Sequence, residues 1–201
     1  MRIICSSPTR VDLAGGTLDL WPLHQLLLSK ATVNIAIDLP ATAEIEVTTG
    51  RNFILRSLDQ QKEVQGTYEE IASGGHSLPL LGLLVQGVWN KNLPAFVLTT
   101  KAHSPKGAGL GGSSALGVSV ASALFAGRSA LHNFLRPSAE NVVGLVGDVE
   151  AHLIKSPTGI QDYWASVRGG TNLIHYPPGG GQVTTLSVEE TKGLSRDLFL
   201  W

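Results

Sequence analysis

A glycine-rich stretch at residues 104–124 contains residue types and spacings that suit the binding of an anion. Four glycines fall within six residues (Gly107, Gly109, Gly111 and Gly112), and two serines follow them. Glycines let backbone N–H groups approach a ligand closely, and the start of a helix adds unpaired N–H donors. The stretch therefore predicts a phosphate-binding loop that runs into a helix. An ordinary turn followed by serine caps is the simpler alternative, although four glycines are more than a cap requires.

Two common phosphate-loop patterns fit this stretch poorly. The pattern GxxxxGK[ST] is absent because no lysine follows the last glycine. Gly107, Gly109 and Gly112 match the dinucleotide pattern GxGxxG, but the strand-like run at 96–100 ends several residues earlier. No acidic residue stands about 20 positions later, where a ribose-binding carboxylate is expected. A dinucleotide-binding oxidoreductase is therefore the weakest of the functions considered.

Composition narrows the class of protein. The 201 residues are 43% hydrophobic and 15% charged, which allows one sizeable core or two small ones. The net charge of −1 gives no electrostatic basis for binding nucleic acid or a membrane surface. Cys5 stands alone, so no disulfide forms within the chain, and the six histidines are too scattered for a zinc motif. Neither a signal peptide nor a membrane-spanning run is evident, so we expect a cytoplasmic protein.

Polar residues near the N-terminus form a second set with spacing that suits chemistry. Arg10 and Asp12 stand at period two on a strand-like run, so they share one face. A diglycine turn follows, and then Thr17 and Asp19 precede an apolar, helix-like stretch. Taken alone, a solvated strand residue and a helix cap are the simpler interpretations of Arg10 and Asp19. Their place beside the diglycine turn favours a functional role only modestly.

Two carboxylates form a third set. Glu150 falls near the end of the helix expected over residues 138–155, where an acidic side chain opposes the helix dipole. Asp162 follows a Pro-Thr-Gly turn and stands beside two aromatic residues. Apolar neighbours can tune the pKa of a carboxyl group, and a loop that follows a helix often carries chemistry. A surface carboxylate is an equally good interpretation of Glu150, and the Asp162 turn alone is a weak signal.

These three segments together resemble one enzyme family. Residues 105–115 (PKGAGLGGSSA) resemble the nucleotide-binding motif of the GHMP kinases, named after galactokinase, homoserine kinase, mevalonate kinase and phosphomevalonate kinase. Residues 8–19 (PTRVDLAGGTLD) resemble the family's first motif, in a form similar to the heptose-phosphate and fucose kinase branch. The missing Glu-His of galactokinases argues against galactose as substrate. Glu150, the turn and Asp162 resemble a third motif, and the order of all three is that of the family.

The resemblance implies ATP-dependent phosphoryl transfer to a hydroxyl of a sugar or sugar phosphate. Asp162 is expected to accept the hydroxyl proton beside Arg10, whose charge is expected to keep the pKa of Asp162 low. Substrate hydroxyls are expected to contact Asp19, Thr17 and Gly16. A non-catalytic domain with the kinase fold, which binds a nucleotide or a partner chain, is the alternative.

The resemblance also implies where ATP and Mg²⁺ bind. Glu150 is expected to hold Mg²⁺ together with Ser113 or Ser114, since two ways of counting the motif leave both serines open. Lys101 and Lys106 are more simply solvated lysines, although either could contact phosphate. The expected ATP-binding residues are Pro105, Lys106, Gly107, Ala108, Gly109, Leu110, Gly111, Gly112, Ser113, Ser114 and Ala115.

The expected fold, also implied by the resemblance, is α+β and similar to domain 2 of ribosomal protein S5, with a mixed or antiparallel sheet packed against helices. Residues 1–201 correspond to the family's N-terminal ATP-binding domain, and we expect its C-terminal domain to be absent or truncated. A homodimer or a complementary C-terminal half is a possible partner, and the apolar run 198–201 a possible interface.

Periodicity and turn residues predict the individual elements. Residues 57–73 read as a polar surface loop. Helices are predicted at 78–90, 113–126 and 138–155, with Ser138 as the N-cap of the last. Strands are predicted at 2–6, 10–14, 32–38, 42–49, 53–58, 96–100, from about 171 to 176, and 182–188.

Overall fold

The computed structural model describes residues 1–20, 23–26, 31–132, 134–177, 182–187 and 189–192. Their strands are β1 (Arg2–Ala14), β2 (Ala31–Val47), β3 (Phe53–Ser57), β4 (Lys62–Gly66), β5 (Phe96–Ala102), β6 (Thr171–His175) and β7 (Gln182–Leu186). Their helices are the 3₁₀ turn η1 (Gly16–Asp19), α1 (Leu23–Leu26), α2 (Tyr68–Ala72), α3 (Pro79–Val88), α4 (Gly112–His132), α5 (Ala139–Ile154) and α6 (Gln161–Arg168). The predicted positions 188 and 194–201 lie outside the described residues.

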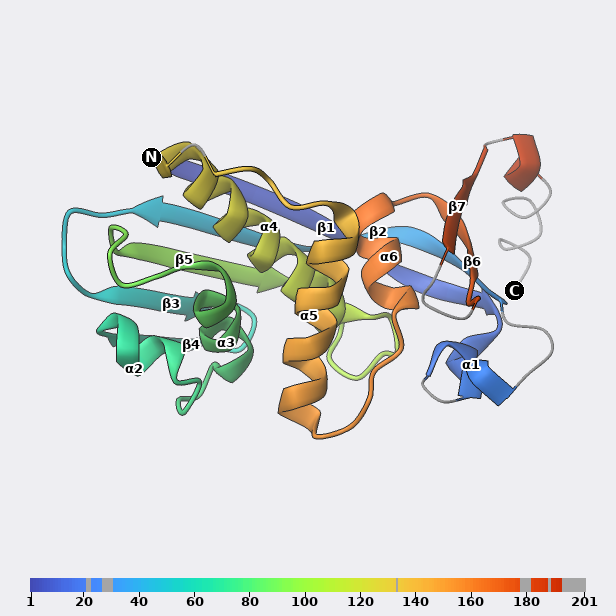
Figure 1. Ribbon diagram of the computed structural model, residues 1–201, viewed down its shortest axis with the longest axis horizontal. Coiled ribbons are helices and arrows are strands. Elements are labelled where there is room, and N and C mark those ends of the chain that lie inside the picture. Colours follow the sequence, from blue (N-terminus) through green and yellow to red (C-terminus); the bar gives the residue numbers. More distant parts are fainter. Residues whose placement is uncertain (21–22, 27–30, 133, 178–181, 188, 193–201) are drawn as a thin grey trace.

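One seven-stranded sheet runs through the molecule in the order β4-β3-β5-β2-β6-β7, and β1 also pairs with β2. The long strand β2 is shared: its first part pairs with β6 and its second part with β5. All these pairs are antiparallel except β3 with β5. The helices lie on one face of this sheet (Figure 1). The predicted α+β class, with a mixed, mostly antiparallel sheet packed against helices, is confirmed.

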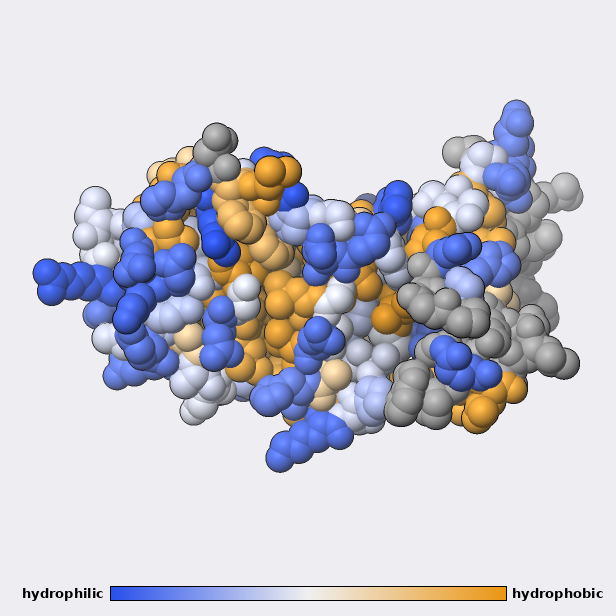
Figure 2. Space-filling model, viewed as in Figure 1, coloured by the Kyte–Doolittle hydropathy of each residue, from blue (hydrophilic) through white to orange (hydrophobic). Residues whose placement is uncertain are grey.

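Alternation along β2 explains why one face of the sheet is covered. Ala41, Ala43 and Ile45 are fully buried beneath the helices, whereas the residues between them are polar and reach the other face. α4 packs on β1 and β2, and α3 and α5 pack in turn on α4. Apolar side chains gather on the helix-covered face over this packed centre, flanked by charged residues (Figure 2).

α4 is the central core helix. Its small residues permit close approach; at Gly117, a Cβ atom would lie only 2.5 Å from Cγ1 of Val146 on α5. α4 is the one described helix that is long and apolar enough to cross a membrane. Of its most apolar 18-residue segment, 61% is buried inside the protein.

Two prolines do not interrupt the strands as predicted. Residues 2–6 and 10–14 belong to a single strand, β1, and residues 32–38 and 42–49 lie largely in a single strand, β2. The register between them shifts at Pro8, which faces the segment that contains Pro40. A proline is tolerated at a bulge because no ladder hydrogen bond is required of it there. The prediction of separate strands was therefore wrong.

The predicted surface loop at 57–73 was also wrong, because this segment contains β4 and α2. β4 pairs with β3 in a hairpin. α2 begins with a capping box, in which the Thr67 hydroxyl accepts from the Glu70 N–H and Glu70 accepts from the Thr67 N–H. The S/T-x-x-E pattern at Thr67 is visible in the sequence and was the missed signal.

The predicted helix 138–155 is confirmed as α5, and Ser138 is its N-cap, with its hydroxyl accepting from the N–H of Asn141. The loop predicted around Asp162 was wrong. Asp162 lies in the first turn of α6, which starts at Gln161 directly after the Pro-Thr-Gly turn. Helix α6 packs on β1, so Asp162 is carried by an element of the core.

Candidate active site

The glycine loop has the backbone conformation of an anion site. Gly107, Gly109 and Gly111 all have a positive φ, between 68° and 77°. Residues other than glycine adopt this backbone conformation only at a cost in free energy. Gly112 then opens α4. Left-handed residues in such a loop can turn backbone N–H groups toward a concave side, and the first turn of α4 adds unpaired N–H groups. The loop is therefore suited to hold phosphate oxygens.

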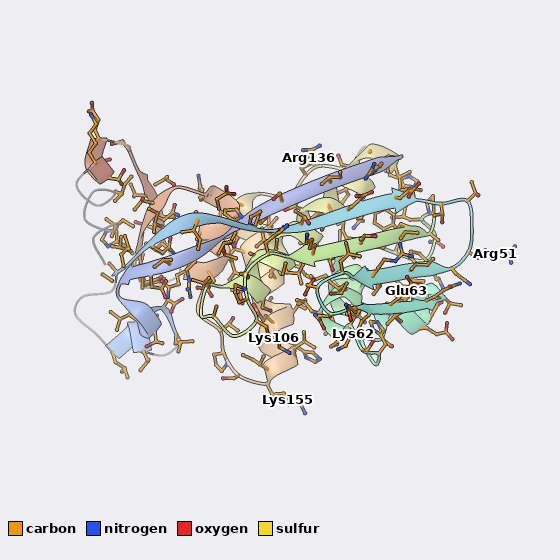
Figure 3. The ribbon with its side chains drawn as sticks, turned by 180° about the vertical axis from the view of Figure 1, so that it is seen from behind. Arg51, Lys62, Glu63, Lys106, Arg136 and Lys155 are labelled. Carbon is orange, nitrogen blue, oxygen red and sulfur yellow. The ribbon has the colours of Figure 1, made fainter. Side chains whose placement is uncertain are left out.

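A pocket of about 820 Å³ opens beside this loop. Its walls include every loop residue from Pro105 to Ser114, together with Glu150 and Asp162. Other walls come from the β3–β4 hairpin, β5 and α3, and include Asp59, Gln60 and Lys62, which sequence reasoning missed. Lys62 on β4 and Lys106 on the glycine loop lie on the same side of the molecule (Figure 3). The two lysines are exposed and place positive charge at the rim, opposite in sign to Asp59, Glu150 and Asp162 of the same lining.

Arg10 joins the glycine loop to Asp162. Its backbone N–H donates to the Leu110 carbonyl at 3.0 Å, and its Nη1 donates to the Gly109 carbonyl. Its Nε and Nη2 each lie 2.7 Å from Oδ1 of Asp162. The Arg10 side chain is only 10% exposed. Arg10 and Asp162, which are 152 positions apart in the sequence, are in contact, as predicted.

The predicted direction of the Asp162 pKa shift was wrong. Burial raises the pKa of the Asp162 carboxyl above its ordinary value, and the nearby Glu150 adds to the rise. The charge and hydrogen bond of Arg10 act in the opposite direction but do not cancel the effect of burial. The sequence showed the cation but not how deeply Asp162 is covered. A raised pKa makes Asp162 a better proton acceptor than an ordinary aspartate.

Stability should therefore depend on pH through this group. Because the folded pKa of Asp162 is raised, its favourable contribution is complete below the unfolded pKa of about 4 and is lost as pH rises through the folded pKa. We expect the free energy of unfolding of Asp162→Asn to fall less than that of the wild type between about pH 4 and pH 7. Urea unfolding measures both profiles, and Asp148→Asn, at an exposed site on α5, is the control. Parallel wild-type and Asp162→Asn profiles would contradict the assignment.

Ser114 on α4 faces Glu150 on the neighbouring helix α5. The Ser114 hydroxyl donates to Oε2 of Glu150 at 3.1 Å. Ser114 is buried and Ser113 is exposed, although both line the pocket. The structure therefore brings Ser114, rather than Ser113, to the carboxylate.

Tyr163 is a further contact of Glu150 that sequence reasoning missed. Its hydroxyl donates to the same oxygen, Oε2, at 2.7 Å. The residue follows Asp162 directly, but nothing in the spacing of the sequence shows that its hydroxyl reaches Glu150. Burial, with Glu150 nearby, raises the pKa of the Tyr163 hydroxyl, so it remains a donor.

Asp19 has a local structural role besides the predicted substrate contact. It is 5% exposed, and its Oδ2 accepts from the backbone N–H of Gln161 at 3.0 Å, at the start of α6. A carboxylate there compensates the unpaired N–H groups and the positive end of the helix. Gly159 leaves the space for it, since a Cβ atom at that position would lie 2.0 Å from Oδ2 of Asp19.

Several predicted site residues lie outside the pocket lining, Arg10 and Asp19 among them. Gly16 and Thr17 lie in η1, where the Gly16 carbonyl accepts from the Gln161 side chain at 2.6 Å. Ala115 is fully buried, and its N–H donates to the Gly111 carbonyl within the start of α4. Lys101 is exposed on β5 and is also outside the lining.

The donor set fits Mg²⁺ bound together with phosphates. Among the described residues, no group of three or more His, Cys, Asp and Glu side chains is arranged to hold a metal ion by itself. Mg²⁺ in phosphoryl-transfer sites is usually held by one or two protein oxygens and by the phosphates of the substrate. The hydroxyl of Ser114 and the carboxylate of Glu150 are hard oxygen ligands beside the loop and supply such a partial set.

Comparisons with solved structures show the same fold. A D-glycero-D-manno-heptose 1-phosphate kinase from Bacteriodes thetaiotaomicron superimposes with a TM-score of 0.76 at 22% identity, over 93% of this chain and 60% of that one. The Methanococcus jannaschii mevalonate kinase gives a TM-score of 0.73 at 18% identity, over 96% and 58%. A Lactococcus lactis galactokinase complexed with galactose gives 0.68 at 18% identity, over 93% and 48%. The chain thus spans about 60% or less of the length of these relatives.

A search of curated protein sequences gave no significant match. A family model, however, matches residues 81–170, and its description is GHMP kinases N terminal domain. This segment contains the glycine loop, Glu150 and Asp162, whereas the motif at residues 8–19 precedes it. The resemblance to the GHMP kinases is thereby confirmed, and residues 81–170 carry the sequence of their N-terminal domain within the matching fold.

Proposed function

We propose that the chain is an ATP-dependent small-molecule kinase, or the N-terminal portion of one, that phosphorylates a hydroxyl of a sugar or sugar phosphate. One observation carries the proposal: Asp162 meets the glycine loop inside the pocket that Ser114 and Glu150 also line. A Cβ atom on Gly111 would lie 3.2 Å from Oδ2 of Asp162. A proton acceptor and an anion-binding loop in contact are what phosphoryl transfer requires.

The glycine loop would hold the ATP phosphates. Backbone N–H groups from Gly107 to Gly112 and the first turn of α4 supply donors without a Walker lysine. Lys106 and Lys62 would add positive charge at the rim. Ser114 and Glu150 would hold Mg²⁺, which supplies charge neutralisation at the phosphates when bound.

Asp162 would act on the acceptor hydroxyl. As the hydroxyl oxygen bonds to the γ-phosphorus and the bond to the bridging oxygen breaks, the hydroxyl proton passes to the Asp162 carboxylate. Arg10 fixes Oδ1 of Asp162, which leaves Oδ2, on the side of Gly111, to face the substrate. The guanidinium also lies next to the loop, where negative charge builds up during transfer.

The acceptor side is proposed from the Gly-Gly-Thr-x-Asp segment. We infer that Asp19 binds a substrate hydroxyl through lone pairs that the backbone N–H groups around it do not occupy, with Thr17 and Gly16 beside it. This segment and the heptose 1-phosphate kinase neighbour support a place in the heptose-phosphate and fucose kinase branch. We propose a cytoplasmic location, where ATP is available.

A second candidate is a non-catalytic kinase-fold domain that binds nucleotide or a partner chain. The superposition with the heptose 1-phosphate kinase covers 60% of that protein, so activity of the whole enzyme is a proposal for this chain. Under either function we propose a second copy of the chain or a complementary C-terminal half as a partner.

The test is a transfer assay on the chain with γ-labelled ATP, Mg²⁺ and a panel of neutral hexoses, heptoses and their phosphate esters. A labelled acceptor that is identified by mass spectrometry supports the kinase. Nucleotide binding without transfer to any acceptor would contradict catalysis by this chain alone.

A further inference from the structure

The two oxygens of the Glu150 carboxylate have different environments. Oε2 accepts two hydrogen bonds, from the Ser114 hydroxyl at 3.1 Å and from the Tyr163 hydroxyl at 2.7 Å. Within the described part of the chain, no hydrogen bond to Oε1 is found. Glu150 is half-buried and lines the pocket. The carboxylate is thus held through one oxygen, and its other oxygen remains available to a ligand in the pocket.

Tyr163 is fixed tightly enough to orient a neighbour. Tyr163 is 1% exposed and belongs to the hydrophobic core that α4, α5 and α6 share. Gly147, one helical turn before Glu150 on α5, lies against the ring: a Cβ atom there would be in ordinary van der Waals contact, 3.4 Å from Cε2 of Tyr163. A ring confined in this way holds its hydroxyl at a constant position.

The same helical turn carries Asp162 and Tyr163, and its start is anchored by buried polar groups. Asp19 accepts from the Gln161 N–H, and Asn34 Nδ2 donates to the Gln161 carbonyl at 3.0 Å. Consecutive helix residues point about 100° apart. Asp162 can therefore face Arg10 and the loop while Tyr163 faces α5 and Glu150.

We propose that Tyr163 is a positioning residue for Glu150: its hydroxyl fixes Oε2, so that Oε1 is presented to Mg²⁺ bound with the nucleotide. This inference rests on the proposed kinase function and deepens it. It assigns Tyr163 an indirect contribution to metal affinity, because hydrogen bonds to a metal ligand orient it and tune its binding. α6 then sets the geometry of both the proton acceptor and the metal ligand.

A purely structural role for Tyr163 predicts a different result from the same substitution. Tyr163→Phe keeps the ring and its packing and removes only the hydroxyl. The matched control is Tyr68→Phe, since the Tyr68 hydroxyl donates to the Trp89 carbonyl at 3.0 Å. Neither Tyr68 nor Trp89 lines the pocket. Both variants lose one hydrogen bond to the protein, and thermal melting shows whether they lose comparable stability.

The measurement is the affinity for a fluorescent, non-hydrolysable ATP analogue with and without Mg²⁺. The Kd measured without Mg²⁺ divided by the Kd measured with Mg²⁺ reports the coupling between metal and nucleotide. We expect Tyr163→Phe to lower this ratio by about tenfold and to leave the metal-free Kd within about twofold of the wild type. Tyr68→Phe should leave both quantities unchanged.

A double-mutant comparison makes the assignment specific. In a Glu150→Gln background, Tyr163→Phe should have no further effect on the ratio, because both substitutions act through one carboxylate. A Tyr163→Phe ratio equal to that of Tyr68→Phe, or an undiminished effect in the Glu150→Gln background, overturns the inference and leaves the proposed function intact. A wild-type chain that binds no nucleotide, or binds it equally without Mg²⁺, overturns the proposed function and the inference with it.

Discussion

Asp162→Asn is expected to slow phosphoryl transfer by about 10²–10⁴-fold, the usual contribution of a positioned general base. Asparagine retains the shape of the side chain and can still accept from Arg10, but it cannot take the proton of the acceptor hydroxyl. The affinity for nucleotide should stay within about twofold, since the glycine loop is unchanged and the substitution acts on the transition state. Product formation at saturating ATP and acceptor measures the effect.

Asp148→Asn is the matched control, because Asp148 is an exposed aspartate on α5 outside the pocket lining. Its rate should equal that of the wild type. Comparable rates for wild type and Asp162→Asn, in proteins with the same thermal stability, would remove Asp162 from the proton transfer and require another acceptor.

Arg10→Met is expected to lower the free energy of unfolding by about 3 kcal/mol at neutral pH, because it leaves buried carboxylate charge unpaired. The methionine fills much of the same volume, but Asp162 and Asp12 lose their cation; Nε of Arg10 lies 3.1 Å from Oδ1 of Asp12. The Asp162 side chain is 25% exposed, so the loss should fall at the lower end of the range for buried pairs. Urea unfolding at pH 7 measures it.

The deficit should shrink as pH is lowered, since the carboxyl groups of Asp12 and Asp162, whose pKa values burial raises, become neutral and need no cation. Arg2→Met is the control on the same strand, because the Arg2–Glu44 ion pair is at the surface and should contribute little. Equal losses for Arg10→Met and Arg2→Met would contradict the central position of Arg10.

The parts of the site that the sequence predicted are those set by local backbone chemistry. Four glycines before a helix imply a loop with positive φ, and Gly107, Gly109 and Gly111 have it. The pairing of Arg10 with Asp162 came from motif order in the family resemblance rather than from local pattern. It depends on α6 packing against β1, which no short segment encodes.

The parts that sequence reasoning missed depend on tertiary context. Pro8 and Pro40 look like strand ends, yet each is accommodated where β1 and β2 shift register. The pKa of Asp162 depends on how much of the carboxyl is covered, and this is decided by packing around it. Tyr163 could not be linked to Glu150 because the link requires the relative placement of α5 and α6.

The structure adds detail to two further assignments. The choice between Ser113 and Ser114, open in the sequence, favours Ser114, because of these two serines only Ser114 is found hydrogen-bonded to Glu150. Asp19, predicted to contact a sugar, is also the carboxylate that receives the start of α6. A substitution of Asp19 therefore changes the anchoring of Asp162 as well as any substrate contact, and its kinetic effect must be interpreted with both in mind.

Isothermal titration of the purified chain with a non-hydrolysable ATP analogue, with and without Mg²⁺, tests the central claim most directly. The glycine loop, Ser114 and Glu150 predict one nucleotide per chain, bound more tightly when Mg²⁺ is present. A well-folded chain that binds no analogue, or that binds it with the same affinity in the absence of Mg²⁺, would contradict the assignment of this pocket as a Mg·ATP site.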